Sequence, residues 1–267
     1  MLIIKPDGLR FSLTYWAQRC FMLPLVWFTY RVANDVHVEG LEHFDEVEGE
    51  TIILAPNHTS AWDSWVGTVW ALSNRRRFVE RSSYTCVLAA PENVPTTPLK
   101  MLTSALGAIP VDRERGIEQP ALQDTLRLMR ESRRQIVVTC YPEGTRSKDG
   151  RVRQKGKAGI GWLQHMTGAP VVPIYHCGAP RMPGIGMNLR LRVGKPMRLE
   201  RWRGAAAEPG TWRGITEEIM GALHGLEADE DRRLGRVPPD RKAARRGLAR
   251  TSAEASAQRH TLSGDPR

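Results

Sequence analysis

The sequence predicts a single α/β domain with a mainly parallel central sheet flanked by helices. Short apolar runs alternate with longer segments of helical apolar spacing between residues 35 and 226, as in strands joined by crossover helices. Two of these runs, Thr51–Ala55 and Gln135–Tyr141, are continuous, which is typical of strands buried on both faces. Of the 267 residues, 41% are apolar and 25% are charged, which excludes a wholly disordered protein and a polytopic membrane protein.

The expected elements follow one another along residues 35–229, which we predict to be one domain because no repeat or internal linker divides them. Leu122 and Leu126 give the segment 118–133 one apolar helical face. Alternating Leu and Arg over 189–193 predict a strand with one exposed face. In order, strands are expected at 36–38, 51–55, within 77–89, and at 108–111, 135–141, 170–175 and 189–193, and helices at 61–73, 98–106, 118–133, 157–166 and 211–226.

Residues 1–34 are expected to form a helical segment that associates with a membrane. The stretch 11–32 is rich in aromatic residues, which favour the membrane interface. Its longest uncharged part, 20–30, spans only about 16 Å as a helix, against a hydrocarbon core of about 30 Å. Pro24 also disfavours a spanning helix, and Arg19 disfavours a signal peptide. Two interpretations remain: a monotopic anchor in one leaflet, or a first helix packed on the core.

The net charge is +10, and half of it lies in residues 230–267. This segment holds ten Lys or Arg and five Asp or Glu, and it has no aromatic residue. It cannot bury enough apolar surface to offset the entropy lost on ordering, so we predict a disordered basic tail. A basic chain favours nucleic acid, anionic lipid or phosphorylated substrates as partners. No nucleic-acid recognition motif accompanies the charge, so no nucleic-acid partner is expected.

The cysteine pattern predicts no metal centre. The four cysteines form no Cys-x-x-Cys pair and no cluster with histidine at zinc spacing. We expect them to be reduced thiols of a cytosolic protein.

The first candidate site lies in the stretch from Pro56 to Asp63, which follows a buried strand and opens a helix. Ser60 suits the N-cap, and Asp63 occupies the place of a capping-box acid. With His58 in the preceding loop, the chain can fold back and bring the imidazole to the Asp63 carboxylate. A carboxylate on one ring nitrogen leaves the other free to take a proton from a hydroxyl. The alternative is that Asp63 only caps the helix and His58 only fills a turn.

A second candidate site, Tyr141–Ser147, also follows a buried strand, at the sheet edge where α/β proteins bind ligands. Gly144 permits close backbone approach, and Thr145 and Arg146 offer donors that suit a phosphate. Glu143 can orient Arg146 or accept a hydrogen bond from a substrate hydroxyl. A third stretch, Gly107–Arg113, ends in a cation that can reach a phosphate. The alternative is that Arg113 only forms a surface salt bridge with Asp112. Lys148 and Arg151 are better explained as parts of a solvated basic loop.

These stretches together resemble the PlsC-type glycerolipid acyltransferases, which include the 1-acylglycerol-3-phosphate acyltransferases. His58 and Asp63 match the His-x4-Asp motif, and Gly107–Arg113 matches the second motif. Tyr141–Ser147 matches Phe-Pro-Glu-Gly-Thr-Arg-Ser with Tyr in place of Phe, and Val172–Ile174 matches the fourth motif. The resemblance covers roughly residues 35–200.

The resemblance implies that His58 is the general base on the acceptor hydroxyl and that Asp63 supports it. It further implies that the acyl donor is an acyl-CoA or acyl carrier protein, that no cofactor or metal is needed, and that the product is phosphatidic acid. The implied acceptor-phosphate and substrate-binding positions are Arg113, Glu143, Gly144, Thr145, Arg146 and Lys155.

The resemblance also favours a monotopic or peripheral protein at the cytoplasmic face of the cell membrane. Two alternatives stay open. One is an acyltransferase for a different lyso-lipid or glycolipid acceptor. The other is a non-catalytic lipid-binding protein on the same fold.

Overall fold

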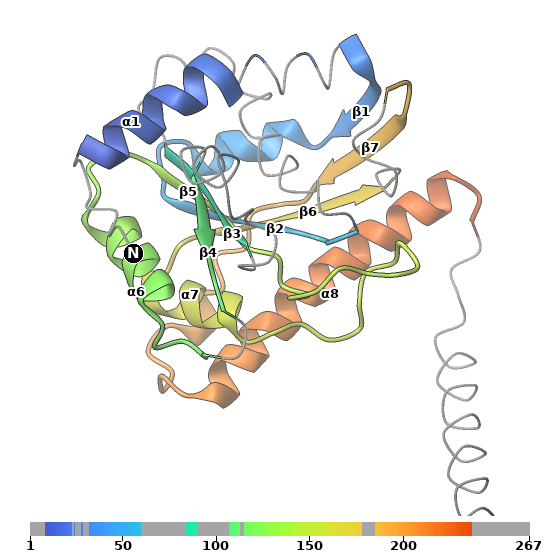
Figure 1. Cartoon of the computed structure of the whole chain (residues 1–267). Coiled ribbons are helices and arrows are strands. Elements are labelled where there is room, and N and C mark those ends of the chain that lie inside the picture. The colour runs from blue at the N-terminus through green and yellow to red at the C-terminus, as the bar shows by residue number, and fades with distance from the viewer. Residues whose placement is uncertain are drawn as a thin grey trace, which may run out of the picture. The chain divides into compact units, whose positions relative to one another are not determined.

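The structure of the chain is a computed structural model, and it describes residues 9–22, 24, 28, 32–59, 84–89, 107–112, 115–177 and 185–236. Seven strands of the described residues form one sheet. The order across the sheet is β1-β7-β6-β2-β5-β3-β4 (Figure 1). The neighbours from β6 to β4 pair in parallel, β7 is antiparallel to β6, and β1 is parallel to β7. The strands are β1 (Asp35–Glu39), β2 (Ile52–Pro56), β3 (Tyr84–Ala89), β4 (Ala108–Pro110), β5 (Ile136–Thr139), β6 (Val171–Cys177) and β7 (Asn188–Val193).

The mainly parallel sheet and its flanking helices confirm the predicted fold class. The described helices are α1 (Leu9–Ala17), the π-helix η1 (Gln18–Met22), the 3-10 helices η3 (Leu41–Val47) and η6 (Glu200–Trp202), and α6 (Pro120–Glu131), α7 (Gly159–Thr167) and α8 (Pro209–Arg233). The helices expected at 61–73 and 98–106 lie outside the described residues. The predicted last helix is longer than expected and continues past residue 230, where the predicted tail begins.

Two apolar clusters cover the two faces of the sheet, and the strand β2 contributes to both. Ile53 and Ala55 belong to the cluster formed with α6, α7 and the first part of α8, whereas Ile52 and Leu54 belong to the cluster formed with η3. Figure 1 shows α6, α7 and the first part of α8 below the sheet and η3 above it. Because successive side chains of a strand point to opposite faces, a strand packed on both sides must be apolar throughout. This explains the continuous apolar run that predicted β2.

The polypeptide divides into two compact units, residues 1–227 and residues 228–267. Of the second unit, the structure describes residues 228–236, which include the helical end of α8. The rest of the predicted basic tail lies outside the described residues, so its disorder stays a prediction.

The four cysteines are free, and burial raises the pKa of the Cys86 and Cys140 thiols to about 12, which keeps them protonated.

The helix α1 and the π-helix η1 that follows it have one side held by the domain and one side exposed. The Gln18 side chain is buried and donates to the Thr85 carbonyl oxygen, and it accepts from the Thr85 amide at 3.2 Å. Arg19 and Arg134 both stack on the Tyr15 ring, with guanidinium carbons 3.4 and 4.4 Å from its centroid. The opposite side exposes large apolar residues: Leu13 (62%), Trp16 (62%) and Phe21 (68%). In the described residues, no helix has the length and apolar character needed to cross a bilayer.

Candidate active site

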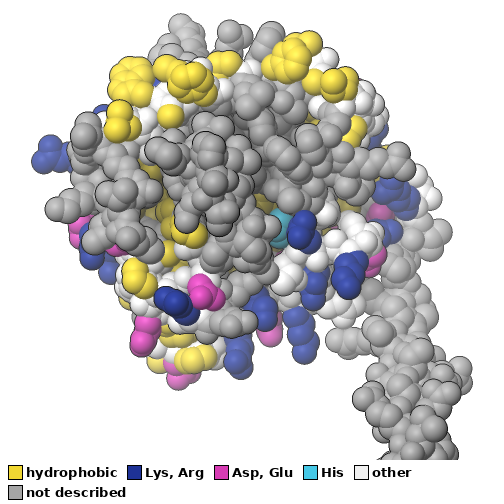
Figure 2. Space-filling model, in the orientation of Figure 1, with side chains coloured by type: hydrophobic (Ala, Val, Ile, Leu, Met, Phe, Trp, Pro, Cys, Tyr) yellow, Lys and Arg dark blue, Asp and Glu magenta, His cyan; other side chains and the backbone are white. Residues whose placement is uncertain are grey.

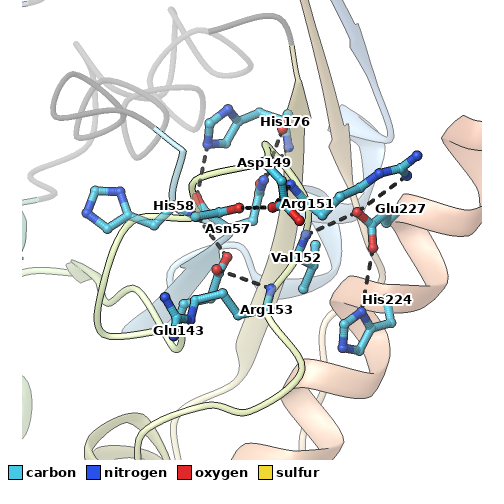
Figure 3. A network of polar contacts seen from close by, with 11 residues as sticks. Asn57, His58, Glu143, Asp149, Arg151, Val152, Arg153, His176, His224 and Glu227 are labelled. Carbon is cyan, nitrogen blue, oxygen red and sulfur yellow. Dashed lines mark hydrogen bonds and ion pairs between the residues drawn. The ribbon is translucent and has the colours of Figure 1, made fainter. Parts of the chain in front are cut away.

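The candidate site lies where β6, β2 and β5, three neighbouring parallel strands, reach their carboxyl ends. His58 follows β2, Tyr141 follows β5, and His176 stands near the end of β6. Carboxyl ends of parallel strands meet at one edge of a sheet, which is where open α/β folds place ligands. Figure 3 shows the resulting polar network around His58.

His58 is held through its backbone and its ring. Its amide donates to Glu143 Oε1 at 2.9 Å, and its carbonyl oxygen accepts from the Ser147 amide at 2.7 Å. Its ring stacks on Tyr141, with centroids 4.3 Å apart and planes 28° apart. The side chain is 8% exposed, so the imidazole is nearly buried in a defined position. Asp63, its predicted partner, lies outside the described residues.

Glu143 links the two predicted motif loops through backbone hydrogen bonds. While Oε1 accepts from His58, Oε2 accepts from the Arg153 amide at 3.2 Å. The side chain is 2% exposed, and burial raises the pKa of this carboxyl to about 7. The two amide hydrogen bonds and the electrostatic influence of Arg153 and His176 oppose that rise in pKa but do not cancel it. The carboxylate therefore binds protein backbone on both oxygens.

The loop after Glu143 folds back on itself. Gly144 has a φ of +67°, and a Cβ there would lie 2.6 Å from Cγ of Lys157. This position therefore requires glycine. The Lys157 amide donates to the Pro142 carbonyl oxygen at 2.7 Å, which closes the loop. Farther along, the Val152 amide donates to Glu227 Oε1 at 3.0 Å and attaches the loop to α8.

Cationic side chains lie along this loop. Arg146, Lys148, Arg153, Lys155 and Lys157 are exposed. Figure 2 shows Lys and Arg side chains on the surface beside a histidine. The loop is therefore a structured, electropositive segment that is hydrogen-bonded to the backbone of His58.

Two polar residues that sequence reasoning did not select belong to the same site. Asn57 and His176 are 0% and 2% exposed and are hydrogen-bonded to each other. Asn57 precedes His58 and His176 follows the fourth motif, but nothing in their local sequence shows that they meet. Knowledge of the strand order would have predicted this contact. β2 and β6 pair in parallel, so the residues at their carboxyl ends lie at the same edge of the sheet.

The structure therefore describes some of the predicted site residues and not others. It brings His58, Glu143 and Gly144 together and places Thr145 and Arg146 next along the same loop. Lys155 lies farther along this loop, two residues after the Arg153 amide that binds Glu143. Asp63 and Arg113 lie outside the described residues. Within the described ranges, no group of three or more His, Cys, Asp or Glu residues is arranged to hold a metal ion.

Comparison with known protein families matches residues 35–177, more than half of the chain, to the family described as Acyltransferase. The chain belongs to the acyltransferase family. A similar solved structure is the 1-acyl-sn-glycerophosphate (LPA) acyltransferase PlsC from Thermotoga maritima, with a TM-score of 0.50 and 18% identity. That match covers 82% of this chain and 78% of the other. No curated protein matches the chain.

These matches confirm the family indicated by the four motifs. The matched range includes every predicted site residue from His58 to Lys155. At 18% identity, the likeness to the Thermotoga maritima enzyme shows that the two chains share a fold. The acyltransferase fold thus positions His58 and the Glu143 loop at one edge of its sheet.

Proposed function

We propose that this acyltransferase moves a fatty acyl group from acyl-CoA or acyl carrier protein to the free hydroxyl of 1-acyl-glycerol-3-phosphate, giving phosphatidic acid. The observation that carries this proposal is the placement of His58, held by Glu143, Ser147 and Tyr141 beside a structured cationic loop. A base next to cations suits an acceptor that has both a hydroxyl and a phosphate. The name of the Thermotoga maritima neighbour supports the same acceptor.

His58 acts in this mechanism as the general base, with Asp63 supporting the imidazole. The ring takes the proton of the acceptor hydroxyl while the hydroxyl oxygen attacks the thioester carbonyl carbon. The tetrahedral intermediate then collapses, the carbon–sulfur bond breaks, and the leaving thiolate takes the proton back from His58. No acyl-enzyme forms, and no cofactor or metal is required.

Backbone amides of the loop are proposed to stabilise the oxyanion of that intermediate. The Gly144 amide already donates to the Tyr141 carbonyl oxygen at 3.1 Å. The amides of Thr145 and Arg146 are therefore the better candidates. This assigns Thr145 to the site through its backbone.

Arg146, Arg113 and Lys155 are proposed to bind the acceptor phosphate. Glu143 has a different role in this proposal, because both of its oxygens bind backbone amides. A negatively charged Glu143 carboxylate would also repel the negatively charged phosphate. Glu143 completes the site by joining the His58 loop to the cationic loop.

Membrane association is proposed to occur through α1 and η1. Leu13, Trp16 and Phe21 form an exposed apolar side, while Gln18 and Tyr15 hold the other side to the domain. Both interpretations of the N-terminal segment therefore find support, since one helix can pack on the core and still present an apolar face to lipid. The proposed location is the cytoplasmic face of the cell membrane, bound monotopically or peripherally.

The decisive experiment uses the purified full chain with lysophosphatidic acid and a series of acyl-CoA and acyl carrier protein donors. We expect phosphatidic acid to form and His58→Ala to lower kcat by roughly 10²–10⁴-fold. His165→Ala, on α7, is the matched control and should keep activity. Full turnover by His58→Ala would contradict the base assignment.

The acceptor panel in the same assay separates the alternatives. Turnover only with another lyso-lipid or a glycolipid would move the proposal to that acceptor. Binding of lyso-lipid without thioester consumption would favour the non-catalytic lipid-binding alternative.

A further inference from the structure

Asn57 and His176 form a reciprocal hydrogen-bonded pair, although 119 positions separate them (Figure 3). Asn57 Nδ2 donates to the His176 carbonyl oxygen at 3.0 Å, and Asn57 Oδ1 accepts from the His176 amide at 2.8 Å. The His176 ring returns the contact, with Nε2 2.9 Å from the Asn57 carbonyl oxygen. Because a carbonyl oxygen can only accept, Nε2 carries the proton in this contact.

The ring contact acts on the peptide unit that connects Asn57 to His58. The carbonyl oxygen of this unit accepts from His176 Nε2, and its N–H donates to Glu143 Oε1 at 2.9 Å. Two buried side chains from different strand ends therefore hold the two polar groups of one peptide plane. The next peptide plane is held in turn, because the His58 carbonyl oxygen accepts from the Ser147 amide at 2.7 Å.

The direction in which a side chain leaves the backbone follows from the two peptide planes that flank its Cα. Both planes that flank the Cα of His58 are held by hydrogen bonds to other parts of the fold. The imidazole is thus aimed before a substrate arrives. General-base catalysis depends on that aim, and a misplacement of about 1 Å can cost roughly 100-fold in rate.

We propose that His176 is a positioning residue for catalysis: it holds the Asn57–His58 peptide so that the His58 imidazole meets the acceptor hydroxyl. The inference rests on the proposed role of His58 as general base. His176 is 2% exposed and its ring contacts the peptide that precedes His58, so we expect it to act through His58 rather than by binding substrate. Its effect should therefore appear in kcat, with KM for lysophosphatidic acid nearly unchanged.

The test compares three substitutions of His176 in the full chain, each assayed with lysophosphatidic acid and a saturating acyl thioester. His176→Leu removes the donor, and we expect kcat to fall by roughly 10–100-fold. His176→Gln keeps an amide donor near the position of Nε2, and we expect it to recover most of that loss. His176→Asn is too short to reach the Asn57 carbonyl oxygen and should behave like His176→Leu.

A matched control separates positioning from stability. Thr125 is fully buried and donates to the Ala121 carbonyl oxygen at 2.8 Å within α6. Thr125→Val removes a buried hydrogen bond away from the network around His58, and kcat should stay within about twofold of the parent once both are folded. Thermal unfolding and circular dichroism verify that every compared variant is folded at the assay temperature. If His176→Leu does not fold, the comparison of His176→Gln with His176→Asn still tests the donor.

A double-substitution cycle distinguishes failure of this inference from failure of the proposed function. If His58→Ala leaves a low but measurable residual rate, and adding His176→Leu to it does not lower that rate further, His176 acts through His58 as proposed. If His58→Ala is inactive but folded His176→Leu keeps the parent kcat, the positioning role is wrong while the base assignment stands. If His58→Ala keeps full turnover, the base assignment fails, and the positioning role fails with it.

Discussion

Glu143 holds His58 through its backbone, because Oε1 of Glu143 accepts the His58 amide at 2.9 Å across 85 positions of the sequence. The second oxygen accepts the Arg153 amide at 3.2 Å, so one buried carboxyl joins His58 to the cationic loop. Burial acts against the charged form of this carboxyl, and its pKa rises to about 7. The link is therefore sensitive to pH in the neutral range.

The first prediction concerns stability. The pKa of Glu143 is raised in the folded state to about 7 from an ordinary value of 4.5, so the folded chain binds this proton more tightly than the unfolded chain. The free energy of unfolding should then fall as pH rises from about 4.5 to about 7, by up to about 3 kcal/mol, and level off above that. Glu143→Gln carries no titrating proton and should lack this slope. Urea unfolding of both proteins across that range measures the difference, and equal slopes would show that the pKa is not raised.

The second prediction concerns the stack between Tyr141 and His58, whose ring centroids lie 4.3 Å apart. The ring face restricts rotation of the imidazole, and any aromatic six-membered ring can supply that face. Tyr141→Phe should therefore keep kcat within about twofold, whereas Tyr141→Leu should lower it roughly tenfold. Steady-state kinetics with lysophosphatidic acid measures both. Loss of activity in Tyr141→Phe would show that the hydroxyl, rather than the ring, is the part that matters.

The sequence predicts the parts of this site that depend on local pattern. Alternate residues of Ile52–Ala55 serve two apolar clusters, so β2 had to be apolar throughout, and the polar stretch after it had to lie at the edge of the sheet. The contacts of Glu143 and His176 could not be predicted in this way. Each depends on where a second, distant loop lies, and the residue types alone are equally consistent with a substrate ligand or an ordinary buried group.

The third prediction distinguishes two neighbouring cations of the loop. Arg146 and Lys148 are both exposed, and only Arg146 is proposed to bind the acceptor phosphate. Arg146→Ala should raise KM for lysophosphatidic acid by roughly 10–100-fold, the usual loss for a charge-assisted hydrogen bond. Lys148→Ala is the matched control and should change KM less than about twofold. Equal effects would mean that the loop attracts the substrate through general electrostatics rather than through Arg146.

The fourth prediction tests the apolar side of α1 and η1 as a membrane contact. Leu13 and Trp16 are each 62% exposed, and replacing both with Ser removes apolar area worth about 1.5–3 kcal/mol per fully buried side chain. The double variant should therefore bind vesicles that contain anionic lipid at least tenfold more weakly in co-sedimentation. Ile185→Ser is the control, because Ile185 is 86% exposed and lies outside this segment, and its binding should match the parent. Unchanged binding by the double variant would assign the exposed face of α1 to some contact other than lipid.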